Sequence, residues 1–385
     1  MVSDPSIVSV QELVKEPLDS IPESFIRLDQ TRPHVLPSKS DHIPTIPTID
    51  MVKILEPSDR SLNDELERLH FACSEWGIFQ ALPQPPGAES SFRFAFLTVL
   101  ITQQLVNHGV SLSLLQKLGL EIEEFFKLPL EEKMKYKPNP GESEGYGNVM
   151  RSEKNVLDWG DRLFMAINPI SLRKPHLFPE LPAPLRSSLE TYIKELKKIA
   201  LQILRSLAIC LHIDTNVIME LFEEEKEFQA LRMTYYPPCP QPELVIGLTP
   251  HSDATAITIL HQINCVNGLQ VKRNGVWLPI DILPDAFVVN VGDIMEILSN
   301  GTYHSIEHQV MVNSESERMS LAMFFNPKLD AQVGPAASLI SLKNQALFRN
   351  ITMNEYVQGL FSQKMDGKSY LDRMRITSSE QAKET

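Results

Sequence analysis

Residues 232–260 read RMTYYPPCPQPELVIGLTPHSDATAITIL, and residues 290–327 read NVGDIMEILSNGTYHSIEHQVMVNSESERMSLAMFFNP. Both stretches contain short runs rich in Val, Ile and Thr, and turn pairs such as Asn274-Gly275 and Asn300-Gly301 separate such runs throughout residues 228–326. Many short strands at near-regular spacing are typical of an all-β sandwich or barrel. We therefore expect a β core here, with strands at LVIGL, AITIL, LQVKR, VWLPI, AFVVNV, IMEIL, SIEHQVMV and SLAMFF.

Helical spacing dominates the chain before this core. Apolar residues at intervals of three and four predict a helix with Ser61 as its N-cap, followed by helices over about 113–126 and about 184–212. A short helix is expected within residues 7–15, and IPTIPTIDM suits an edge strand because of its prolines. The sequence thus predicts a helical N-terminal half against a C-terminal β core.

Composition limits the classes of partner. Lys and Arg number 36 against 49 Asp and Glu, a net charge of -13, which argues against nucleic acid and anionic membranes as partners. The N-terminus lacks the features of a secretory signal, and no apolar run approaches the ~20 residues that span a bilayer. Four scattered cysteines without a CxxC pair indicate reduced thiols. We expect a soluble, cytoplasmic monomer that acts on a small molecule.

The triplet His251-Ser252-Asp253 carries the clearest chemical signal. On an extended segment, residues i and i+2 point to the same side, so an imidazole and a carboxylate face one point. His308, on a later expected strand, is the candidate third ligand. Two His and one carboxylate on one face of Fe(II) leave positions open for O2 and an organic co-ligand. An HxD alone, however, is more often a turn with a satisfied histidine.

A second pair with the same spacing is Arg318 and Ser320. A guanidinium beside a hydroxyl can hold a carboxylate through two parallel hydrogen bonds and a third. Tyr236 in TYYPPCP could add a phenolic hydroxyl to the same anion. Taken singly, an Arg-x-Ser triplet is usually a surface position, and this tyrosine would be interpreted as an aromatic packed against prolines.

Together these motifs resemble the plant 2-oxoglutarate- and Fe(II)-dependent dioxygenases. The resemblance is strongest to the senescence-related and codeine O-demethylase-like branch, which is related to flavonol and anthocyanidin synthases. It continues upstream through ELERLHFACSEWGIFQ, LVNHGV, EEFFKLPLEEKMKY and EGYG. It implies an α+β fold, in which N-terminal helices flank a double-stranded β-helix (jelly roll) core.

The resemblance also implies roles for the candidate residues. His251, Asp253 and His308 would bind Fe(II), while Arg318, Ser320 and Tyr236 would bind 2-oxoglutarate. The expected enzyme is an oxidoreductase of specialised metabolism that uses O2, and ascorbate as reductant. It would hydroxylate, desaturate or O-demethylate a small metabolite while 2-oxoglutarate becomes succinate. Two alternatives stay open: an iron oxidase of the aminocyclopropane-carboxylate type without 2-oxoglutarate, and a catalytically impaired homologue that binds a small molecule.

The expected organisation has four parts: an N-terminal arm (1–48), a helical N-terminal dioxygenase region (49–225), the jelly-roll core (226–330) and a C-terminal helical extension (331–385). Two features depart from the family pattern. Thr234 stands where an Asn is common, which could alter one contact to the co-substrate. Residues 81–104 separate WGIFQ from LVNHGV, and we interpret them either as a translated intron or mispredicted exon, or as a genuine surface loop.

Overall fold

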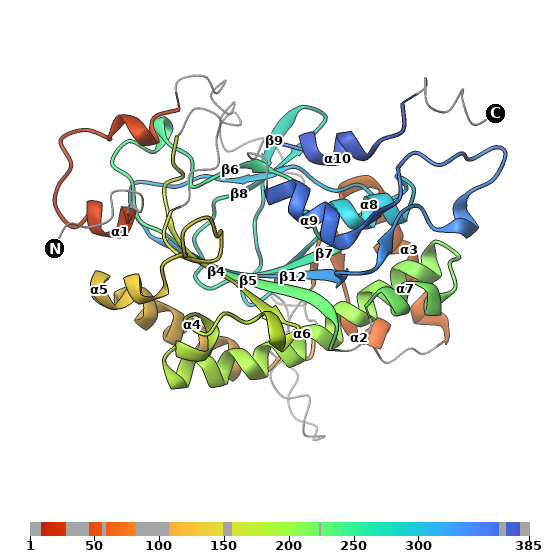
Figure 1. Ribbon diagram of the computed structural model, residues 1–385, viewed down its shortest axis with the longest axis horizontal. Coiled ribbons are helices and arrows are strands. Elements are labelled where there is room, and N and C mark those ends of the chain that lie inside the picture. The colour runs from red at the N-terminus through yellow and green to blue at the C-terminus, as the bar shows by residue number, and fades with distance from the viewer. Residues whose placement is uncertain are drawn as a thin grey trace, which may run out of the picture.

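Two facing β-sheets form the centre of the computed structural model, which describes residues 9–27, 46–55, 59–81, 108–148, 156–222, 225–361 and 367–377. The larger sheet has eight strands and the smaller one four. Figure 1 shows the two sheets one above the other. Apart from the parallel pair β1–β2, the strands of both sheets pair antiparallel. This is the jelly-roll architecture that the sequence predicts.

The strand order places segments from both halves of the chain in one sheet. The larger sheet runs β1 (Thr48–Ile49), β2 (Ile78–Ala81), β10 (Phe287–Val291), β7 (Ile257–Gln262), β12 (Arg318–Lys328), β5 (Glu227–Tyr236), β4 (Asp161–Asn168) and β3 (Gly145–Tyr146). The smaller sheet runs β6 (Leu248–His251), β11 (His308–Val310), β8 (Leu269–Arg273) and β9 (Val276–Pro279). A separate pair joins β13 (Gln332–Val333) to β14 (Ile351–Thr352). β6 is thus an edge strand.

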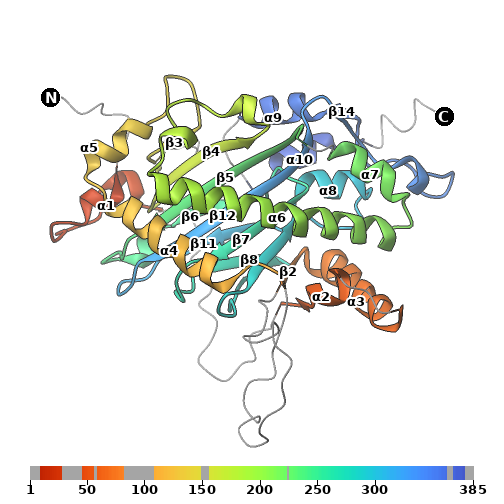
Figure 2. The same ribbon diagram turned by 90° about the horizontal axis from the view of Figure 1, so that it is seen from below.

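Helices cover the outer face of the larger sheet. The longest, α6 (Ala183–Cys210), crosses this face beside α4 (Leu112–Lys127) (Figure 2). Leu189, Leu196 and Ile203 on the inner side of α6 are fully buried, and burying such a side chain stabilises a fold by roughly 1.5–3 kcal/mol. The remaining helices are α1 (Val10–Leu13), α2 (Met51–Leu55), α3 (Asp59–Phe71), α5 (Leu130–Lys133), α7 (Thr215–Leu221), α8 (Asp293–Leu298), α9 (Met353–Phe361) and α10 (Ser369–Met374).

Several predicted elements are confirmed. The helices expected over 113–126 and 184–212 are α4 and α6, and Ser111 caps α4 by accepting a hydrogen bond from the backbone N–H of Leu114. The short N-terminal helix is α1, and the expected proline-marked strand is the two-residue edge strand β1.

Three expectations are wrong. LVIGL is not a strand, because Leu244 ends a short 3-10 helix (Pro242–Leu244) and β6 begins only at Leu248. Ser61 does not cap a helix, because α3 begins at Asp59. IMEIL forms most of helix α8 rather than a strand. α8 has only six residues and all six are buried, including the acidic Asp293 and Glu296, so the run is too short and too apolar overall to show a helical period. Gly292 directly precedes α8. A Cβ at this position would lie 2.1 Å from the backbone oxygen of Thr255, so only glycine fits there.

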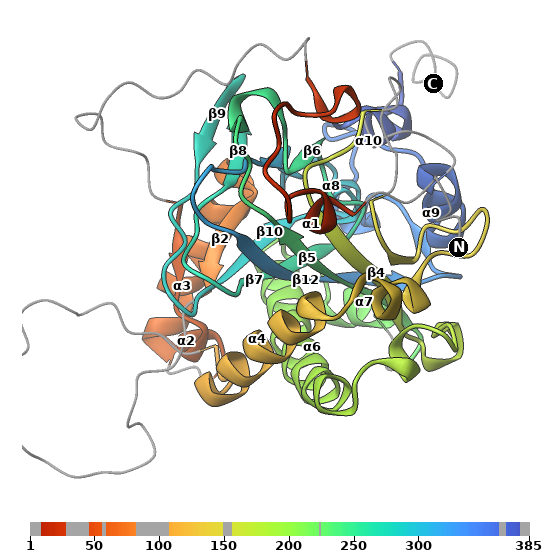
Figure 3. The same cartoon turned by 90° about the vertical axis from the view of Figure 1, so that its left-hand side faces the viewer.

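Residues 9–27 of the N-terminal arm lie on the smaller sheet's side of the molecule, and their C-terminal end is close to β6 (Figure 3). The insertion predicted over 81–104 lies outside the described residues, except for Ala81 at the end of β2. The four-part division of the chain remains a prediction, although β2 and β4 come from the region expected to be helical. Within the described ranges, no helix has the length and apolar character needed to cross a membrane.

Candidate active site

His251 and His308 meet across the smaller sheet. They are directly opposite each other in the antiparallel ladder of β6 and β11, and their ring centroids are 4.3 Å apart. Asp253 follows β6 by two residues, and all three side chains are buried. One ligand atom from each lies within 4.8 Å of the other two. The structure therefore brings together the three residues that the HxD and EHQV motifs suggested.

The two oxygens of Asp253 have different surroundings. Oδ1 faces Nε2 of His251 at 3.4 Å and Nε2 of His308 at 3.8 Å. Oδ2 accepts hydrogen bonds from the Thr258 hydroxyl (2.7 Å) and the Asn290 amide (2.9 Å). Burial would raise the pKa of Asp253, but His308 and His251 hold it well below its usual range. The carboxylate is thus ionised, with one oxygen fixed and the other directed at the histidines.

The histidines present the same ring nitrogen to this point. Nδ1 of His251 lies 2.8 Å from the carbonyl oxygen of Thr249, and Nδ1 of His308 lies 3.2 Å from that of Ile306. Since a carbonyl only accepts, Nδ1 carries the proton in the neutral form of each ring, and in that form Nε2 has the lone pair. Burial lowers the pKa of His308 to about 4, which favours its neutral form.

These features fit a divalent metal ion. Nε2 of His251 is buried and has no hydrogen-bond partner among the described residues, and a buried polar atom normally has one. Two lone pairs and a carboxylate oxygen repel one another unless a cation lies between them. A 2-His-1-carboxylate set is the arrangement that non-haem Fe(II) oxygenases use. The donor atoms therefore match Fe(II).

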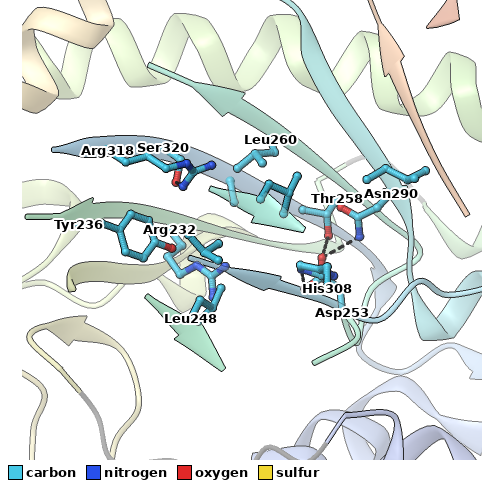
Figure 4. A pocket seen from close by; sticks show the side chains of 14 residues that line it. Arg232, Tyr236, Leu248, Asp253, Thr258, Leu260, Asn290, His308, Arg318 and Ser320 are labelled. Carbon is cyan, nitrogen blue, oxygen red and sulfur yellow. Dashed lines mark hydrogen bonds and ion pairs between the residues drawn. The ribbon is translucent and has the colours of Figure 1, made fainter. Parts of the chain in front are cut away.

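Arg318 and Ser320 lie at the other end of the same pocket (Figure 4). Arg318 is only 2% exposed, and its Nη1 donates a long hydrogen bond of 3.4 Å to the Ser320 hydroxyl. Its Nε and Nη2 have no partner in the part of the chain that the structure describes. Burial lowers the pKa of this guanidinium. A buried cation with two unused donors fits a carboxylate ligand.

Glycines allow the ring of Tyr236 and the guanidinium of Arg318 to lie close together. Tyr236 is opposite Arg318 in the ladder of β5 and β12, and the guanidinium carbon is 5.3 Å from the ring centroid. A Cβ at Gly160 or Gly247 would lie 2.9 Å from the Tyr236 ring, and one at Gly268 would lie 3.1 Å from Cδ of Arg318. Side chains at these positions would displace the proposed carboxylate-binding residues.

The pocket between the two clusters contains Arg232, which the sequence analysis did not single out. In Figure 4 Arg232 lies between Tyr236 and His308. Its guanidinium carbon is 5.4 Å from the centroid of the Phe324 ring, and it makes no hydrogen bond or ion pair within the described residues. Its position four residues before Tyr236 on one strand could have revealed it, because i and i+4 share a face.

Thr258 and Asn290 were also missed. Their roles depend on the pairing of β7 with β10, which places them opposite each other beside Asp253. A single sequence shows neither that pairing nor its register. The remaining described histidines have other surroundings: His108, for example, stacks on Phe287 at 4.2 Å between ring centroids.

Comparison with known proteins gives a consistent family. The model of the 2OG-Fe(II) oxygenase superfamily matches residues 227–327, and that of the non-haem dioxygenase in morphine synthesis N-terminal region matches residues 102–181. The oxoglutarate-dependent flavonoid 7-O-demethylase 1 of Ocimum basilicum is 46% identical over 371 residues, 96% of this chain and 91% of that protein. Thebaine 6-O-demethylase of Papaver somniferum is 44% identical over 377 residues, 96% of each chain.

A solved structure agrees with these relatives. The crystal structure of JOX2 in complex with 2OG, Fe and JA is 35% identical and superimposes with a TM-score of 0.81, covering 96% of this chain and 98% of that one. Since the identity exceeds 30% along almost the whole chain, and the structure assembles the donor set expected of this family, the chain belongs to the 2OG-Fe(II) oxygenase superfamily.

Proposed function

We propose that His251, Asp253 and His308 are the Fe(II) ligands of this dioxygenase, and that Arg318, Ser320 and Tyr236 bind 2-oxoglutarate. The observation that carries the proposal is the convergence of the three ligand atoms within 4.8 Å. Arg318, Ser320 and Tyr236 line the same pocket as Asp253 and His308. A co-substrate could therefore bind the iron at one end and the guanidinium at the other.

Bound Fe(II) supplies the oxidative chemistry, in which O2 and 2-oxoglutarate yield succinate and CO2 and a C–H bond of the substrate is oxidised. The protein's own part is to orient the reactants. Thr258 and Asn290 hold Oδ2 of Asp253 so that Oδ1 stays directed at the metal position. The backbone carbonyls of Thr249 and Ile306 fix the tautomers of the two histidines.

The carboxylate-binding residues select a dicarboxylic acid of suitable length. The distal carboxylate of 2-oxoglutarate would use the two free donors of Arg318 and the Ser320 hydroxyl. Thr234, where the family commonly has Asn, is opposite Ser320 in the ladder and is 7% exposed. A hydroxyl therefore takes the place of an amide beside this carboxylate.

The substrate would lie against the face of the larger sheet that carries the Arg232 side chain, beside its neighbours on β4 and β12. Phe164 and Ala322 are directly opposite Arg232 on β4 and β12, so the three side chains share one face. The rings of Phe164 and Phe324 are 6.1 Å apart between centroids. Aromatic faces beside an unpaired guanidinium suit a largely apolar ring compound that presents an oxygen acceptor. The demethylases of flavonoids and thebaine among the relatives support this class.

We further propose that the protein acts as a monomer in the cytoplasm of a plant cell, in specialised metabolism. All four cysteines are free, and Cys73 and Cys239 are buried, which suits a reducing compartment. The relatives from Ocimum, Papaver and Arabidopsis support the plant origin.

Succinate formation tests the activity and its alternatives. The protein is incubated with Fe(II), ascorbate, O2 and 2-oxoglutarate, with and without a 7-methoxyflavone or thebaine as probe. Succinate that requires Fe(II) is the expected result. Consumption of O2 without succinate would favour the oxidase that does not use 2-oxoglutarate, and absence of both would favour the impaired homologue.

Formaldehyde distinguishes O-demethylation from the other outcomes. Oxidation of a methoxyl C–H gives a hemiacetal, which breaks down to the free hydroxyl and formaldehyde. We expect formaldehyde in step with succinate from a methoxylated probe and none from the same flavone without the methoxyl group. Succinate without formaldehyde, together with a product that is heavier than the probe by one oxygen atom (about 16 mass units), would indicate hydroxylation.

A further inference from the structure

We infer that Arg27 of the N-terminal arm is a positioning residue for the metal centre, because it holds His251 in place through Asp158 and Thr249. The inference rests on the proposed function, since it assigns a role relative to His251 as a metal ligand. Arg27 precedes Thr249 by 222 residues, so nothing in the local sequence connects the two.

The connection consists of hydrogen bonds of ordinary length. Nη2 of Arg27 donates to Oδ1 of Asp158 and to the Thr249 hydroxyl, both at 2.8 Å. Oδ1 of Asp158 also accepts from the Thr249 hydroxyl at 2.6 Å and from the Thr249 backbone N–H at 3.1 Å. The carbonyl of Thr249 then accepts from Nδ1 of His251 at 2.8 Å. Arg27 and Asp158 thus hold Thr249 in place, and the carbonyl of Thr249 in turn sets the tautomer of His251.

The position of β6 explains why this support matters. β6 is the edge strand of the smaller sheet, so a strand ladder holds it on one side, through β11, and only an isolated bridge from His251 to Gly367 holds its other side. An edge strand that a single bridge holds on its outer side opens locally more readily than a central strand. Asp158 and Arg27 fasten this strand at Thr249, two residues before His251. On this account the arm reduces the freedom of the strand that carries a metal ligand.

Packing holds the arm itself in place. Phe25 and Trp159 are almost fully buried and pack edge to face, with ring centroids 5.2 Å apart. The backbone N–H of Arg27 donates to the carbonyl of Leu244 at 2.9 Å, and that of Trp159 donates to the carbonyl of Ile246 at 2.7 Å. The Arg27 side chain is 9% exposed and that of Asp158 is 21% exposed, so solvent screens the pair only partly.

The test is the affinity for Fe(II), measured anaerobically with saturating 2-oxoglutarate by the visible metal-to-ligand charge-transfer band. Arg27→Met and Thr249→Val are expected to weaken Fe(II) binding by about tenfold, the range for residues that orient metal ligands. Thr249→Ser keeps the hydroxyl and should bind Fe(II) like the wild type. The affinity for 2-oxoglutarate at saturating Fe(II) should not change, because Arg318 takes no part in these contacts.

Arg173→Met is the matched control. Arg173 is 13% exposed and pairs with Glu190 at 2.7 Å, and its other contacts are to Ile167 and Phe178 rather than to a metal ligand. The Arg173→Met substitution should lower the thermal midpoint of the metal-free protein without altering its affinity for Fe(II). Wild-type affinity in a folded Arg27→Met or in Thr249→Val, or an equal loss in Arg173→Met, would overturn the inference. Thr249→Val is nearly isosteric, so it answers the question even if Arg27→Met does not fold. A wild type that binds no Fe(II) would instead overturn the proposed function, and this inference with it.

Discussion

His251 and His308 are paired directly across the β6–β11 ladder, although His308 follows His251 by 57 residues in the chain. Directly opposed residues of an antiparallel pair place their side chains on the same face. Asp253, two residues beyond the end of β6, completes the set of three candidate metal ligands. The geometry of the site is therefore a consequence of strand register, and a slip of one residue would direct one histidine away.

Arg318→Lys should raise the 2-oxoglutarate concentration that gives half-maximal succinate production, by about tenfold or more. Lysine carries a point charge and cannot reproduce the planar pair of donors that Arg318 leaves free. The measurement is succinate formation against 2-oxoglutarate concentration. Arg273→Lys, at a partly exposed arginine over the Trp76 ring, is the control and should behave as wild type. An unchanged requirement in Arg318→Lys would remove Arg318 from the proposed carboxylate-binding residues.

Arg232→Met should raise the KM for an oxygen-bearing substrate while the KM for 2-oxoglutarate stays the same. Arg232 lies in the pocket near His308 and has no anionic partner in the described chain, so its donors are available to a substrate. Methionine keeps much of the length without the charge. The comparison is made on whichever methoxylated probe supports coupled turnover. A rise in the KM for 2-oxoglutarate alone would place Arg232 with the co-substrate instead.

Part of this site was predictable from the sequence and part was not. The HxD and RxS triplets each place two groups on one strand face, a local property, and the structure brings those residues together as expected. Thr258, Asn290, Arg27 and Asp158 depend on contacts between segments distant in the chain. Their local sequences contain no signal of those contacts.

The same limit applies to the fold. α6 shows a clear apolar stripe and was located to within two residues at either end. α8 was mistaken for a strand because it has only six residues, all buried, and a run that short cannot be told from a buried strand by its pattern of apolar residues. Strand β4 was not predicted, and only its pairing with β5 makes its place in the sheet evident.

The free energy of unfolding should fall as the pH falls from about 6.5 to about 4. Burial lowers the pKa of both His108 and His261 from 6.5 to about 4, so each binds a proton more readily in the unfolded chain. Unfolding then takes up protons in this window, and acid favours it. Above about 6.5 both residues are neutral in either state and contribute no pH dependence.

Urea midpoints of the metal-free protein at about pH 7 and about pH 5 measure this effect. His261→Phe keeps an aromatic ring against Phe287, whose centroid lies 5.8 Å from that of His261, and removes one titrating group. Its midpoint should decline less between the two pH values than that of the wild type. Equal declines would mean that His261 has no part in the acid sensitivity.

Deleting residues 81–104, which joins Gln80 to Leu105, should leave a folded protein. Ala81 is directly opposite Phe287 in the β2–β10 ladder, and the His108 ring stacks on Phe287 at 4.2 Å. Ala81 and His108, the described residues on either side of the stretch, therefore both lie beside Phe287. In the deletion variant Leu105 would follow Gln80, and three residues of extended chain, which reach about 10 Å, would link β2 to His108.

The thermal midpoint of the deletion variant and its succinate production provide the measurement. Loss of folding on deletion would show that the stretch is part of the stable structure, as a genuine loop with a packed role. Sequencing transcripts across the junction decides its origin separately: a segment present in all messages would exclude a retained intron.

The most direct test of the account is an anaerobic titration of the protein with Fe(II) and then 2-oxoglutarate, followed by the visible charge-transfer band of the ternary complex. The wild type should develop the band, and His251→Ala and Asp253→Ala should not, since each lacks one of three ligands. His304→Ala, at an exposed histidine four residues before His308, should keep it. Absence of the band from the wild type, or a wild-type band in Asp253→Ala, would contradict the proposed metal site.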